Sequence, residues 1–189
     1  MMKTYYLSAL LLIALFTLPV AHSSQVTVET ITQDEVKSSL SAVGNHRFIY
    51  RMFFNLYDAK FYTDAAQIGD IDKLLDGKNA LLLEFDYLRK IKKSIILESS
   101  ENILAKNMSP DDLGLIQERL DRINEAYRTV DKGDRSGLSY IPGKGTTLSI
   151  NKEPIVTIEG EDFARLYFRI WLGEQPISQS MRDALLSRN

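Results

Sequence analysis

The last third of the chain constrains the fold more strongly than any other segment. Turn residues separate three short segments there, at 138–141, 146–150 and 155–158, which mix apolar residues with Ser, Thr and Tyr. Runs of this length between turns are typical of β-strands joined by tight connections. Apolar residues then recur at helical spacing from 163 to 171, and Gly173 ends the pattern. The segment therefore predicts neighbouring strands followed by a helix that packs on them.

Residues 46–62 alternate between two faces, which predicts one long strand or a pair of strands rich in aromatic residues. The more apolar face is made of His46, Phe48, Tyr50, Met52, Phe54 and Leu56. The other face mixes apolar side chains with Arg47, Asn55 and Tyr57. We expect the first face to pack on the core and the second to line a pocket.

The middle of the chain predicts helices around one central strand. The expected helices are 70–76, 94–106, 109–130 and, near the end of the chain, 178–186, and the expected strand is 80–85. Ser109 and Pro110 form a strong helix start, a capping hydroxyl followed by proline at the first helical position. The order strands, helices, strands, helices predicts an α+β domain, an antiparallel sheet with helices packed on one face.

The N-terminus has the pattern of an export signal. An apolar run at 7–18 follows Lys3 and is followed by a proline and small residues as far as Ser23. This order is typical of a cleaved secretory signal peptide. The run is shorter than the roughly 20 apolar residues that span a bilayer, so we expect no stable membrane span after cleavage, although an uncleaved anchor is the alternative. We predict a signal peptide at 1–23 and a single domain at 24–189, periplasmic or secreted.

Composition excludes several kinds of site. The chain has no cysteine, so it has neither a disulfide framework nor a thiolate metal site. Its formal net charge is −2 and it has no long basic run, so nucleic acid is not an expected partner. Loss of His22 with the signal peptide would leave His46 as the single histidine, which excludes a multi-histidine metal site.

Motifs spread along the chain resemble the chalcone isomerase-like family in its bacterial branch. They are Gly44-x-x-Arg47, Phe53-Phe54-x-x-Tyr57-x-Ala59-x-x-Tyr62, Tyr87-Leu88-Arg89-x-Ile91, Gly133-Asp134, Tyr140-x-Pro142-Gly143-x-Gly145-Thr146, and Gly160-x-x-Phe163-Ala164 through Trp171-Leu172-Gly173-Glu174-x-Pro176. The resemblance implies an open-faced β-sandwich, in which a large antiparallel sheet carries a helical layer. It also implies an apolar cleft between sheet and helices.

The chain matches the enzymes of the family at one catalytic position and differs from them at the others. In plant members of the family an intramolecular addition closes a chalcone to a flavanone, and an arginine near the start of the long strand stabilises the developing enolate. Arg47 matches that arginine, and a guanidinium suits an oxyanion because its donors are planar and always charged. The other catalytic positions of the family differ here, where they are occupied by Tyr57, Lys92, Ser99 and Trp171.

Three functions therefore stay open. The first is a non-catalytic binder of a small apolar or anionic ligand, with Arg47 as anchor and Tyr57, Tyr62 and Trp171 as walls of the cleft. The second is an intramolecular lyase or isomerase acting on an unsaturated carbonyl compound. The third is a haem protein with His46 as axial ligand, although strict alternation places His46 and Arg47 on opposite faces. The sequence names neither the ligand nor the oligomeric state.

Overall fold

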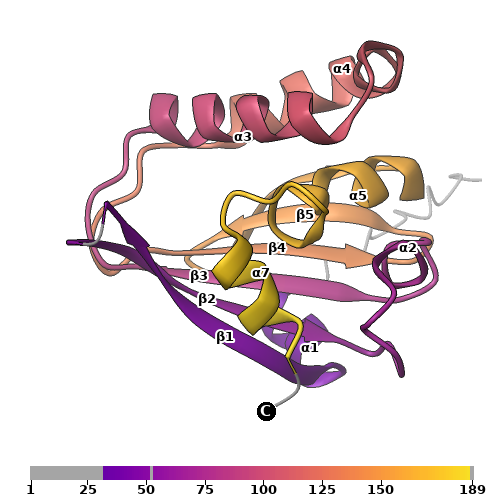
Figure 1. Ribbon diagram of the computed structural model, residues 1–189, viewed down its shortest axis with the longest axis horizontal. Helices are drawn as coiled ribbons and strands as arrows, with labels where there is room; N and C mark the ends of the chain where they lie inside the picture. Colours follow the sequence, from indigo (N-terminus) through magenta and orange to yellow (C-terminus); the bar gives the residue numbers. More distant parts are fainter. Residues whose placement is uncertain (1–31, 52, 188–189) are drawn as a thin grey trace, which may run out of the picture.

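The computed structural model describes residues 32–51 and 53–187, and the predicted signal peptide lies outside them. One six-stranded antiparallel sheet forms the body of the protein, and each strand pairs with the next along the chain (Figure 1). The strands are β1 (Ser41–Tyr50), β2 (Phe54–Thr63), β3 (Leu81–Tyr87), β4 (Arg135–Ile141), β5 (Gly145–Ile150) and β6 (Glu153–Ile158). The predicted antiparallel sheet is confirmed.

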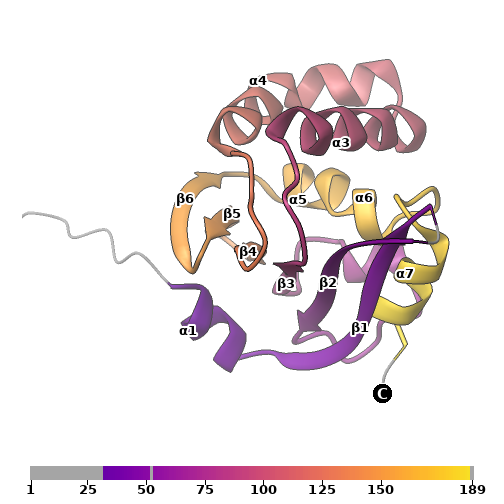
Figure 2. The same cartoon turned by 90° about the vertical axis from the view of Figure 1, so that its left-hand side faces the viewer.

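Seven helices accompany the sheet in the described part of the chain. They are α1 (Gln33–Ser38), α2 (Ile71–Leu74), α3 (Lys93–Asn107), α4 (Pro110–Ala126), α5 (Glu161–Tyr167), α6 (Arg169–Leu172) and α7 (Gln179–Leu185). Figure 2 shows α3 and α4 as an upper layer, with α5 and α6 between that layer and the sheet. The expected single helix at 163–171 is divided in two at Phe168, which ends α5 and precedes α6.

The α+β class is confirmed, with one addition on the outer face of the sheet. The short helix α1 covers part of the face opposite the helical layer, where Gln33 donates a hydrogen bond of 2.9 Å to the buried carboxylate of Glu84. The Lys37 ammonium lies 2.5 Å from the same carboxylate. A buried charge needs such partners, because its desolvation is otherwise costly.

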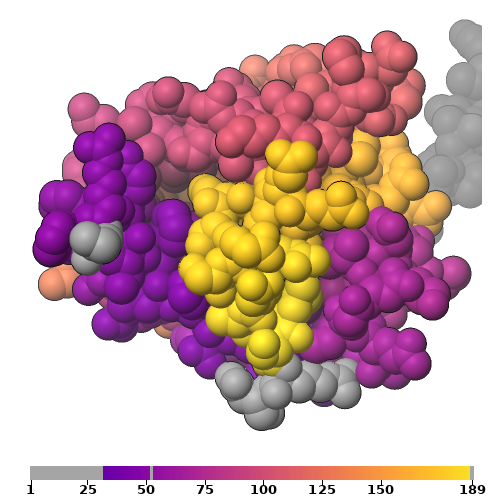
Figure 3. All heavy atoms as spheres, in the orientation of Figure 1, coloured from indigo at the N-terminus to yellow at the C-terminus, as the bar shows by residue number. Residues whose placement is uncertain are grey.

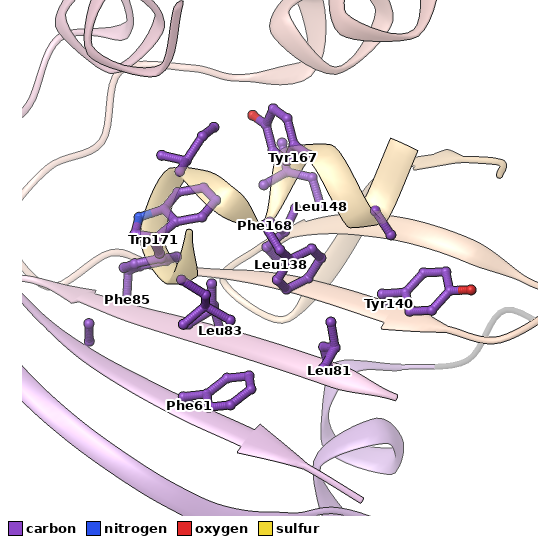
Figure 4. Close-up of a cluster of buried hydrophobic side chains, with 14 of the residues drawn as sticks. Phe61, Leu81, Leu83, Phe85, Leu138, Tyr140, Leu148, Tyr167, Phe168 and Trp171 are labelled. Carbon is purple, nitrogen blue, oxygen red and sulfur yellow. The ribbon is translucent and has the colours of Figure 1, made fainter. Parts of the chain in front are cut away.

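The core lies between the inner face of the sheet and the helices above it, and it includes Ile103 and Leu104 of α3 together with residues of α4 to α7. Along β3 the inner side chains alternate with outer ones, as the period of two in a strand requires. On α4 the side chains of Ile116, Leu120 and Ile123 are buried, and the Ser109 hydroxyl caps the helix by accepting from the Asp112 amide at 3.1 Å. Figure 4 shows three aromatic side chains above the strands: Tyr167 of α5, Phe168 between the two helices, and Trp171 of α6.

Residues 46–62 form a hairpin of two strands, and its faces differ from the prediction. Of the expected core face, His46, Phe48 and Leu56 are half-buried, but Tyr50 and Phe54 are exposed, and Met52 lies outside the described residues. From Tyr57 onward the odd-numbered residues Tyr57, Ala59 and Phe61 are buried instead. The reason is a register shift: Phe48 pairs with Tyr57 while Ile49 pairs with Asn55. The extra residue in β2 reverses which parity faces the core.

No helix within residues 32–51 and 53–187 is both long and apolar enough to cross a bilayer.

Candidate functional site

A cavity of about 920 Å³ lies between α3 and the inner face of the sheet. Two connecting segments lift α3 and α4 away from the strands at this end, as Figures 1 and 2 show. The segments are joined by two backbone hydrogen bonds, from Ile91 to Val130 at 2.9 Å and from Val130 to Ile91 at 3.0 Å. Because the paired segments hold α3 above the sheet, the side chains of α3 do not close the space below it. In Figure 3 the entrance lies between the hairpin of β1 and β2 (indigo), α3 and the C-terminal segment (yellow).

Aromatic side chains form the inner wall of the cavity. The Phe85 ring lies at the centre, with ring centroids 5.3 Å from both Tyr57 and Trp171. Tyr57 is 8% and Trp171 7% exposed, so both are wall residues with little solvent contact. The close-up in Figure 4 shows Trp171 on α6 above Phe85 on β3. The structure thus brings together two of the predicted ligand-contacting residues, Tyr57 and Trp171.

Buried hydroxyl groups are the polar component of this wall. The hydroxyl groups of Tyr87 and Ser136 are 2.9 Å apart, and the Tyr167 hydroxyl lies 3.4 Å from that of Tyr127. Burial raises the pKa of the phenols of Tyr57, Tyr87, Tyr127 and Tyr167. All four therefore stay protonated and uncharged at neutral pH. Tyr57, Tyr87 and Tyr127 line the cavity and can form hydrogen bonds with a ligand, whereas Tyr167 does not line it.

Charged side chains occur at the mouth of the cavity. The charged residues that line it are Arg89, Lys90, Lys92 and Glu98, and all four are exposed. The Arg89 guanidinium lies 4.9 Å from the Phe54 ring centroid, and the Lys90 ammonium pairs with Asp131 at 3.1 Å. The site therefore has an apolar, neutral interior and a mouth with an excess of positive charge.

Arg47 lies on the opposite face of the sheet from this cavity. Its guanidinium forms hydrogen bonds of 2.7 and 2.8 Å with the carboxylate of Asp58, and its side chain is 53% exposed. This pairing holds the pKa of Asp58 below its usual range. Asp58 pairs in register with Asp86 on β3, and Asp86 pairs with Arg135 on β4. A row of charged side chains therefore continues across the outer face of the sheet. The predicted position of Arg47 in the cleft is corrected, because alternation along β1 turns its side chain outward.

Tyr62 and His46 are also outside the lining of the cavity. Tyr62 is on the outer face, where the Lys37 ammonium lies 4.7 Å from its ring centroid. His46 pairs in register with Ala59 and is on the inner face, but it lies nearer the start of β1 than Phe48, which lines the cavity. Helix α7 packs against this strand. An axial haem ligand would have to reach the cavity, and His46 does not line it. The described residues contain no cluster of three or more metal-binding side chains.

Several lining residues were not assigned to the site from the sequence. Tyr87 and Arg89 belong to the motif Tyr87-Leu88-Arg89-x-Ile91, which was noted without a functional interpretation. This motif follows a buried strand and precedes α3, and its arginine could have been assigned to the rim on that ground. Tyr127 gave no such signal, because in the sequence it continues the helical spacing of the apolar residues Ile116, Leu120 and Ile123.

Comparisons with known proteins bear on the fold and the family. A sequence profile described as chalcone isomerase-like matches residues 24–187. Among solved structures, a fatty-acid binding protein of Arabidopsis thaliana superposes with a TM-score of 0.60 at 16% sequence identity, covering 78% of this chain and 87% of that one. No curated protein sequence matches the chain significantly. At this identity the structural likeness shows the fold alone, while the profile spans most of the sequence. The chain therefore belongs to the chalcone isomerase-like family.

Proposed function

We propose that the protein is an exported, non-catalytic binder of a long-chain fatty acid or a similar single-chain carboxylate, held in the cavity beneath α3. The observation that carries this proposal is the cavity itself, about 920 Å³ in volume, walled by buried aromatic rings and rimmed by cations. Its volume lies near the upper end of the range of about 300–1,000 Å³ for small-molecule pockets. An elongated apolar chain can fill such a space and exclude water from the rings.

The charge distribution favours one orientation of the ligand. A carboxylate buried beside the tyrosines would lose its hydration, and the Tyr87 hydroxyl is already engaged with Ser136. At the mouth, Arg89 and Lys92 can pair with the carboxylate while it stays partly hydrated. We therefore place the carboxylate at the mouth and the hydrocarbon chain along Phe85 and Trp171.

The chemistry of the wall supports binding over proton transfer. Phenols whose pKa is raised by burial are poor general bases at neutral pH, since they hold their protons tightly. The arginine expected to stabilise an enolate lies on the outer face of the sheet, paired with Asp58. Binding is also the property named for the Arabidopsis protein that shares the fold. Export rests on the signal pattern at 1–23.

Replacing Arg89 and Lys92 together by glutamine should weaken binding of a fatty acid and leave binding of the corresponding fatty alcohol unchanged. Exposed ion pairs contribute about 0.2–1 kcal/mol each, so the expected loss for two is roughly 2- to 30-fold in Kd. Trp171 is the only tryptophan of the chain and it lines the cavity, so its fluorescence reports binding directly.

Arg47→Gln is the matched control for this experiment. The arginine has the same charge as Arg89, but it lies on the outer face and pairs with Asp58, so its loss should not change the affinity for the fatty acid. A loss of affinity in Arg47→Gln and none in the double variant would return the anchor role to Arg47. Absence of any saturable change in Trp171 fluorescence with fatty acids of all chain lengths would contradict the proposed function.

A further inference from the structure

Exposed apolar side chains gather around the mouth of the cavity. Seven large apolar side chains are exposed in the described residues, and five of them lie on the β1–β2 hairpin or at the start of α3. These five are Ile49, Tyr50, Phe53, Phe54 and Ile95. Phe53, in the turn of the hairpin, is 79% exposed and does not line the cavity. An apolar cluster of this kind on a protein surface marks an interaction site.

Positively charged side chains lie among these apolar side chains. The Arg51 guanidinium lies 5.2 Å from the Tyr50 ring centroid, and Arg89 lies over Phe54. Within the described residues, Arg51, Arg89 and Lys92 form no ion pair with a carboxylate. The acidic groups nearby are Glu98, which lines the cavity, and Asp131, which pairs with Lys90.

We propose that this mouth surface, made of Tyr50, Arg51, Phe53, Phe54, Arg89 and Ile95, docks on a bilayer that contains anionic phospholipids. The Tyr50 ring is suited to the level of the lipid headgroups, because it combines an apolar body with a polar hydroxyl group. The phenyl rings of Phe53 and Phe54 can leave water for the boundary between headgroups and acyl chains. Cations beside them are attracted to anionic headgroups, and the two contributions add. The inference rests on the proposed function, since docking would turn the open end of the cavity toward the source of the ligand.

Charge complementarity favours a bilayer over a second copy of this chain. A symmetric dimer through the mouth surface would bring Arg51 and Arg89 of one copy toward the same residues of the other. Like charges at an interface oppose association unless acidic groups lie opposite them, and none of the six residues of the mouth surface is acidic. Of the acidic groups beside it, Asp131 already pairs with Lys90, which leaves Glu98 against three cations. An anionic lipid surface supplies the missing negative charge.

The test is co-sedimentation of the chain from Ser24 onward, which contains every element of the described fold, with phospholipid vesicles. We expect binding to phosphatidylcholine vesicles that contain phosphatidylglycerol, and much weaker binding to phosphatidylcholine alone. Phe53→Ser should reduce the partition coefficient roughly tenfold, because a phenyl ring leaves the interface. Arg51→Asn should reduce it about fivefold, because one cation is lost. Asparagine suits the positive φ of 48° at this position.

Leu115→Ser and Lys144→Asn are the matched controls. Leu115 is 75% exposed on α4, and Lys144 lies in the β4–β5 turn at the other end of the sheet. Neither control should change vesicle binding. None of the four variants alters a residue that lines the cavity, so fatty acid affinity measured by Trp171 fluorescence should stay constant in all of them.

The outcomes separate docking from ligand binding. Vesicle binding that Phe53→Ser and Arg51→Asn do not reduce would overturn the docking surface, even if fatty acids bind in solution. Self-association that Phe53→Ser abolishes, without vesicle binding, would overturn it in favour of a second copy as occupant. Vesicle binding lost in both variants supports the docking surface, even if no fatty acid binds and the proposed function fails.

Discussion

Gly44→Ala should destabilise the protein by about 1–3 kcal/mol or more, because the added methyl group has no space. A Cβ atom on Gly44 would lie 2.0 Å from the carbonyl oxygen of Ala184 and 2.8 Å from that of Leu185. Both oxygens belong to the backbone of α7, so no side-chain rotation can relieve the contact. α7 would have to move away from β1, and we expect a lower free energy of unfolding in urea.

Gly114→Ala is the matched control and should change stability in the opposite direction. Gly114 is exposed within α4, and nothing lies within 4 Å of a Cβ added there. Alanine in a helix is favoured over glycine by about 0.5–1 kcal/mol, so the variant should be more stable than the parent chain. Equal destabilisation by both substitutions would contradict the account of Gly44, since the clash would then not be its cause.

The result for Gly44 also bears on how the motif that begins at this residue is interpreted. Gly44 opens the motif Gly44-x-x-Arg47, whose arginine is turned to the outer face. The motif thus joins two structural requirements on β1, close approach of α7 on one face and an ion pair with Asp58 on the other. Its occurrence here is explained without a ligand.

Ser99→Phe should abolish most of the ligand binding without unfolding the protein. Ser99 is half-buried on α3 and lines the cavity, so a phenyl ring there enters the space assigned to the hydrocarbon chain. Forcing a ligand into an overfilled site costs about 1–3 kcal/mol, which is roughly 5- to 150-fold in Kd. Titration of fatty acid against Trp171 fluorescence measures the change.

Ala105→Phe is the control on the same helix. Ala105 is exposed and does not line the cavity, so its replacement adds the same ring outside the site and should leave the affinity unaltered. Undiminished binding in Ser99→Phe, with an unfolding curve like that of the parent chain, would show that the ligand lies elsewhere.

Local patterns in the sequence were sufficient for most of the fold. The alternation before Leu56, the apolar run of β3 and the capped start of α4 each depend on side-chain periods or caps that act within a few residues. The motifs from Gly44 to Pro176 identified the family, and the profile over residues 24–187 shows it. Tyr57, Tyr62 and Trp171 were assigned to the cleft together, as large side chains with one polar group, and of these Tyr57 and Trp171 line the cavity.

Tertiary structure alone decided where the polar groups of the site lie. The sequence shows that His46 and Arg47 are on opposite faces, but only strand pairing determines that Arg47 meets Asp58 on the outer face. The extra residue near Leu56 reverses the faces of β2, and no local pattern marks it. The lift of α3 depends on hydrogen bonds between Ile91 and Val130, far apart in the chain. A side-chain period is a local property of the sequence, whereas register and cavity are properties of segments that meet only in the folded chain.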